Sequence, residues 1–131
     1  MRLREKSREA VYKLRVQTGY WVGDPVDYEV GILEDLETAK LFKEEFFETL
    51  KCRIEELGLG LLVELRESEE ESSFGWQACV ELRSVEVGAR GEACVEDVLR
   101  AAKFPGALEI KGFGGGVRCY LYKEWQVVWG Y

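Results

Sequence analysis

An apolar stripe with a helical period runs through the middle of the chain and limits how the rest can fold. Asp35 can cap the start of this helix, and Gly58 can end it in a left-handed conformation. A helix of about six turns with one apolar face needs another layer of structure to cover that face. The stripe repeats every three or four positions, with Lys and Glu between its members: Leu36, Ala39, Phe42, Phe46, Leu50, Ile54 and Leu57.

Segments with a two-residue period supply the other layer. Residues 12–17 and 28–32 alternate between apolar and polar side chains and predict a hairpin around turn residues 18–25. Residues 92–103 predict a shorter helix, ended by Pro105 and Gly106. The acidic run from Glu67 to Ser73 predicts an exposed loop. Further strands are predicted at residues 61–66, 74–87, 107–111, 117–122 and 125–131.

The expected fold is α+β, with a mostly antiparallel sheet and two helices packed on one face. Residues 12–66 and 61–111 share a strand–helix–strand outline, so a pseudo-duplicated, ferredoxin-like variant is one form of this fold. We expect one domain over residues 1–131. We allow for a mobile basic arm at residues 1–9, which contain Arg2, Arg4, Lys6 and Arg8. The second face of the sheet would be solvated or covered by another molecule.

The residue types that are missing restrict the chemistry. The chain has no His, the usual proton-transfer group near neutral pH and the commonest metal ligand. A Ser-His-Asp or Cys-His arrangement is therefore excluded, and we expect a non-catalytic protein without a cofactor or a metal. Asn is also absent and Glu is abundant, which is the composition of heat-adapted proteins.

Cysteine spacing and hydropathy indicate where the protein works. Cys52, Cys79, Cys94 and Cys119 lack the close pairing of zinc ligands, so buried thiols are expected, with a disulfide as the alternative. The basic N-terminus lacks the apolar stretch of a signal peptide, and no run of about 18 apolar residues could span a bilayer. We expect a cytoplasmic protein with no membrane partner.

A glycine-rich segment follows the second predicted helix. Its backbone N–H groups could form a nest for an anion, with Lys111 adding positive charge. The spacing differs from the dinucleotide and phosphate-loop fingerprints, and the segment leads into a strand, so a hairpin connection is the simpler interpretation. The anion-binding candidates are Lys111, Gly112, Gly114, Gly115 and Gly116.

The strand that follows predicts an aromatic and basic sheet face. Arg118, Tyr120 and Tyr122 alternate along it, and such a face can stack nucleic-acid bases. The net charge, 18 − 25 = −7, repels a polyanion overall, so binding would also need the local basic arm. An ordinary second layer or a dimer contact is the alternative interpretation of this face.

Two further sets of residues suggest a protein partner. The acidic run can dock a basic partner or can keep the chain soluble. Large aromatic residues in loops and near the end of the chain are typical anchors of protein interfaces, although they can also close the edge of a core. The partner-binding candidates are Glu69, Glu70, Glu71, Tyr20, Trp21, Trp125, Trp129 and Tyr131.

These patterns favour a small acidic binding or accessory module that acts through a protein partner or by self-association as an oligomer. The alternative is a nucleic-acid-binding accessory protein that uses the Arg and Tyr face and the basic arm. A second alternative is a small-ligand or phosphate-binding enzyme built on the glycine segment.

Overall fold

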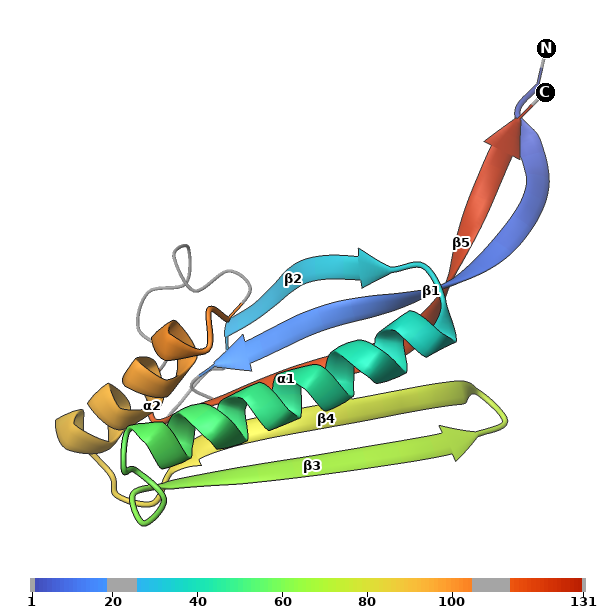
Figure 1. Cartoon of the computed structure of the whole chain (residues 1–131). Helices are drawn as coiled ribbons and strands as arrows, with labels where there is room; N and C mark the ends of the chain where they lie inside the picture. Colours follow the sequence, from blue (N-terminus) through green and yellow to red (C-terminus); the bar gives the residue numbers. More distant parts are fainter. Residues whose placement is uncertain (1, 19–25, 105–113, 131) are drawn as a thin grey trace.

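The computed structural model describes residues 2–18, 26–104 and 114–130. Within these ranges two helices and five strands follow one another as β1, β2, α1, β3, β4, α2 and β5 (Figure 1). The helices are α1 (Leu36–Glu56) and α2 (Ala89–Ala101). The strands are β1 (Arg4–Thr18), β2 (Val26–Leu33), β3 (Val63–Ser72), β4 (Gly75–Ser84) and β5 (Gly116–Gly130).

The strands form one sheet in the order β2-β1-β5-β4-β3, and every neighbouring pair is antiparallel. The α+β class, the antiparallel sheet and the two helices are therefore confirmed. The ferredoxin-like duplication is not confirmed, since α1 connects β2 to β3 at opposite edges, whereas α2 connects neighbours β4 and β5. No helix in the described ranges is long and apolar enough to cross a membrane.

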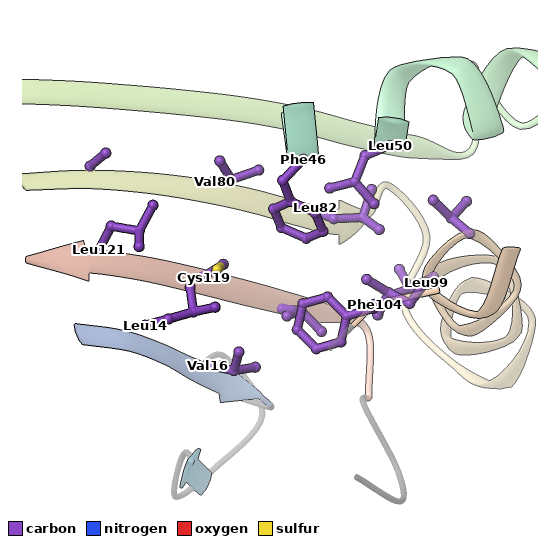
Figure 2. Packing of buried hydrophobic residues seen from close by; sticks show 14 of the residues in the cluster. Leu14, Val16, Phe46, Leu50, Val80, Leu82, Leu99, Phe104, Cys119 and Leu121 are labelled. Atoms are coloured by element: carbon purple, nitrogen blue, oxygen red, sulfur yellow. The ribbon is translucent and has the colours of Figure 1, made fainter. Parts of the chain in front are cut away.

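Both helices pack on one face of the sheet and form a single core with it. Leu50 of α1 and Leu99 of α2 are almost fully buried, as are Leu82 of β4 and Val16 of β1. Figure 2 shows these side chains gathered between the helices and the strands. Alternate strand positions point into this core, which is the consequence of the two-residue period in the sequence.

The long helix is confirmed to within one residue at each end. Asp35 caps it, accepting a hydrogen bond of 2.7 Å from the backbone N–H of Thr38. At the other end Gly58 has a φ of 68°, the left-handed conformation that glycine adopts without strain. The buried positions of α1 follow the predicted stripe, with one exception, Lys43.

Three predictions about the strands were wrong or too short. The acidic run is not a loop, because β3 continues to Ser72 and pairs with β4 along its whole length. The exposed part of this edge strand begins at Arg66, and its backbone ladder needs no apolar side chains. The two predicted C-terminal strands are one continuous strand, β5. The segment assigned to a mobile arm lies largely in β1, where Arg4–Glu9 pair with β5.

Candidate binding surfaces

The sheet face away from the helices, here called the open face, carries the Arg and Tyr side chains that the sequence placed together. Arg118, Tyr120 and Tyr122 occupy alternate positions of β5, whereas Cys119 and Leu121 point into the core. Because β5 is the central strand, its open-face side chains have neighbours on both sides. These neighbours come from strands that are far from β5 in the sequence.

A hollow of about 830 Å³ lies on the open face, and its charged lining is mainly acidic. Among the described residues that line it, Arg15 is the one basic side chain, against three carboxylates. The two tyrosines supply aromatic surface, and Gln77 and Ser68 supply neutral polar groups. The lining residues are Arg15, Asp27, Ser68, Glu69, Glu70, Gln77, Ala78, Cys79, Tyr120, Leu121 and Tyr122.

Ion pairs within the chain occupy the arginines of this face. Arg118 Nε donates to Glu81 at 2.7 Å, and its Nη1 lies 3.5 Å from the Tyr120 hydroxyl. Arg15 Nε donates to Asp27 at 3.1 Å, and this hydrogen bond is the main reason that the pKa of Arg15 is raised. A phosphate would have to compete with these carboxylates. The face is therefore better suited to an uncharged or cationic group than to a polyanion.

A second surface is formed where the two longest strands leave the sheet. Arg4–Ala10 of β1 pair with Trp125–Gly130 of β5, and we call this pair of segments the β1/β5 ribbon. Figure 1 shows the ribbon projecting past the N-terminal end of α1. A two-stranded ribbon without a covering layer is marginally stable in water.

Two tryptophans lie on the same face of this ribbon. Trp125 and Trp129 are four positions apart on a strand with no register shift, so both continue the face that points into the core further along β5. Their exposed fractions are 56% and 62%, and Val128 on the other face is 36% exposed. The Lys123 ammonium lies 4.5 Å from the ring centroid of Trp125, which leaves most of the indole surface accessible. Large exposed aromatic side chains outside the core are characteristic of protein interfaces.

The acidic candidates lie on β3, and two of the three have internal partners. The indole N–H of buried Trp76 donates to Glu69 at 2.7 Å, and the Gln77 amide donates to Glu70 at 2.9 Å. Glu71 is exposed and lies opposite Trp76 in the β3–β4 register. Glu69 and Glu70 therefore also have structural roles, in addition to forming an acidic edge with Glu71.

The glycine segment is described only from Gly114 onward. Gly114 has a φ of 67°, Gly115 accepts a backbone hydrogen bond from Ser84 at 2.7 Å, and Gly116 begins β5. The carbonyl of Gly115 is thus used to join β4 to the start of β5. Lys111 and Gly112 lie outside the described residues, as do the partner candidates Tyr20, Trp21 and Tyr131 and the predicted strand 107–111.

The four cysteines are free thiols in different environments. Cys94 and Cys119 are buried, Cys79 is half-buried on the open face, and Cys52 is exposed. Burial raises the pKa of Cys119, and burial with the nearby charge of Glu81 raises that of Cys79. Among the described residues, no group of three or more Cys, Asp and Glu is arranged to hold a metal ion.

Comparison of the chain with models of protein families, with curated proteins and with solved structures found no match. The open face and the β1/β5 ribbon are therefore the two features of the molecule that indicate a function. Arg118, Tyr120 and Tyr122 could be predicted from the sequence to share a face, whereas their neighbours Arg15, Asp27 and Gln77 could not. The alternation along each strand indicated the open face, whereas the order of the strands has no signal in a single sequence.

Proposed function

We propose that the protein is a small, non-catalytic binding module that acts by contact with another protein chain, and that the β1/β5 ribbon is its contact surface. The observation that carries this proposal is the pair of exposed indoles, Trp125 and Trp129, on a ribbon that projects beyond both helices. Covering these side chains would remove apolar surface from water and would stabilise a ribbon that is marginal alone.

The ribbon is also suited to specific rather than indiscriminate contact. Arg8 lies directly opposite Val127, and Glu5 lies opposite Trp129, so charged side chains border the apolar strip on the same face. An apolar centre with a polar border is the usual anatomy of a protein interface. Anchoring by a few large aromatic residues is likewise the usual source of binding energy.

Affinity capture with ribbon variants tests this proposal. We expect the tagged protein to retain a stoichiometric protein partner, or an untagged copy of itself, after nuclease treatment. The double variant Trp125→Ala/Trp129→Ala should lose at least about tenfold of this material, because interface tryptophans commonly contribute about 2 kcal/mol or more each. The matched control is Leu61→Ala/Val87→Ala, which removes side chains that are each 92% exposed elsewhere on the molecule. Equal retention by both double variants contradicts the proposal.

The open face supports a second candidate function, an accessory role in nucleic-acid binding. Tyr120 and Tyr122 lie in the hollow with Arg15, so bases could stack on them. This function ranks second because Glu81 and Asp27 already pair with the arginines. Titration of a fluorescent single-stranded oligonucleotide tests it: affinity should fall steeply with salt and should be reduced by Tyr120→Ala and Tyr122→Ala. Binding that is absent at low salt, or that ignores both changes, removes this candidate.

A further inference from the structure

The β1/β5 ribbon has two outer edges that lack a neighbouring strand in the described parts of the chain. β2 pairs with β1 only from Tyr12 to Thr18, and β4 pairs with β5 only from Gly116 to Tyr122. The outer backbone groups of Arg4–Ala10 and of Trp125–Gly130 are therefore free of ladder hydrogen bonds to these strands. Such an edge can accept a further strand from another chain.

The two edges differ in how well they would accept a strand. The β1 edge carries Arg4, Glu5, Lys6, Arg8 and Glu9, and its register shifts between Glu5 and Ser7. Charged side chains and bulges are the features that protect natural edge strands against pairing. The β5 edge has no charged residue from Trp125 to Gly130. Every residue of this segment has a partner in β1, so β5 itself contains no bulge. The β5 edge is thus the one that favours a new partner.

We propose that the β5 edge pairs antiparallel with the β5 edge of a second copy of this chain, about a two-fold axis at Val127. This inference rests on the proposed function, for which it names the partner. The spacing of the ribbon side chains is symmetric about Val127, with Trp125 two positions before it and Trp129 two positions after it. A two-fold axis through Val127 places Trp125 of each copy opposite Trp129 of the other. Cross-strand aromatic pairs of this kind stabilise antiparallel sheets.

Charge complementarity supports the same register. The two-fold axis at Val127 places Glu124 opposite Gly130 of the second copy. In the β1–β5 register Arg4 lies beside Gly130. The Lys6 side chain lies on the same side of Gly130, because a Cβ added to Gly130 would be 2.9 Å from Lys6 Cγ and Cε. The Glu124 carboxylate lies 3.5 Å from the Lys13 ammonium of its own chain. In the dimer it would also face two basic side chains of the second copy, across a residue that has no side chain of its own.

Neighbouring registers lack these features. An axis at Gln126 places Trp125 opposite Val127 and Glu124 opposite Val128, while an axis at Val128 places Gln126 opposite Gly130. Neither pairs the two indoles or brings Glu124 to the basic residues. The register centred on Val127 joins the ribbons into a four-stranded sheet, which supplies the additional strands that an isolated ribbon lacks.

The position of Val127 at the axis allows a sharp test, because each copy meets its own residue there. Sedimentation velocity of the full-length protein should show a dimer. Val127→Lys and Val127→Glu should each weaken the dimer by at least about tenfold, since like charges then face each other at the axis. An equimolar mixture of the two variants should restore association as a heterodimer. Val87→Lys and Val87→Glu, at a position that is 92% exposed, are the matched controls and should leave the dimer unchanged.

Each outcome decides the question. A wild-type chain that remains monomeric up to about 0.1 mM overturns the inference. A dimer that either Val127 variant leaves intact, or that the mixture fails to restore, also overturns it. Circular dichroism checks folding; if a Val127 variant unfolds, Glu124→Lys replaces it and should weaken the dimer by reversing the charge that faces Arg4 and Lys6.

If the wild type is monomeric but still captures a different protein through its tryptophans, this inference fails while the proposed function stands. If neither the dimer nor tryptophan-dependent capture is found, both fail.

Discussion

The ion pair between Lys43 and Glu67 gives a direct test of how α1 is held against β3. Lys43 lies on the buried face of α1 and is 6% exposed, and its ammonium is 2.7 Å from a Glu67 carboxylate oxygen. The Glu67 side chain is 42% exposed. The two ends of the pair therefore have different access to water, so removing one end should not have the same effect as removing the other.

The burial values set the expected magnitudes. Glu67→Gln leaves a buried ammonium without its counter-charge, and breaking a fully buried pair costs about 3–5 kcal/mol. Because Glu67 is partly exposed and water can replace it, we expect a loss of about 1–3 kcal/mol in the free energy of unfolding. Lys43→Met keeps most of the packing and leaves a carboxylate that water can solvate. That change should therefore alter the stability by less than about 1 kcal/mol.

Urea unfolding of both single variants and of the double variant measures these effects and their coupling. The double variant should have the same free energy of unfolding as Lys43→Met, because no buried charge needs Glu67 once Lys43 is replaced. The reasoning is refuted if Lys43→Met is the more destabilising change. It is equally refuted if the two single effects simply add in the double variant.

Two more predictions concern Asp35 and the thiols. The Thr38 N–H holds the pKa of Asp35 below its ordinary value, so the cap stabilises the fold fully above the unfolded pKa of about 4 and loses this effect as pH falls through the lower folded-state pKa. Asp35→Ala should lower the urea midpoint at pH 7, and this difference should shrink as the pH falls below about 4; a difference that stays the same size in acid contradicts this. In native protein at pH 8, maleimide or iodoacetamide should label exposed Cys52 first and Cys79 more slowly, and should spare Cys94 and Cys119 until the chain unfolds. Native-state labelling of Cys119 at the rate of Cys52, measured by mass spectrometry, would show that the core is open.

The sequence by itself determined the elements in which local pattern and burial agree. The stripe from Leu36 to Ile54 has one period, a capping Asp and a terminating Gly, so every local signal indicates the same helix. The face shared by Arg118, Tyr120 and Tyr122 was likewise fixed by alternation, because successive residues of a strand point to opposite sides.

Only the tertiary structure decided where β1, β3 and β5 end. The segment from Arg4 to Glu9 has no apolar period, and it becomes a strand because β5 lies beside it. The acidic run likewise becomes a strand because β4 lies beside it. Lys43 of α1 forms an ion pair with its side chains, and Trp76 and Gln77 of β4 donate hydrogen bonds to them. Pairing of this kind depends on a distant part of the chain, and a single sequence contains no record of which segments meet.

For the same physical reason, the sequence indicated the residues of the β1/β5 ribbon but not their arrangement. Trp125 and Trp129 could be named from the sequence as candidate anchors because large aromatic residues are typical of protein interfaces. Their common face, the ribbon that carries them and the open edge of β5 follow from the sheet order, which long-range backbone hydrogen bonds establish. Side-chain chemistry was therefore available from the sequence, whereas the geometry of the proposed binding surface came from non-local pairing.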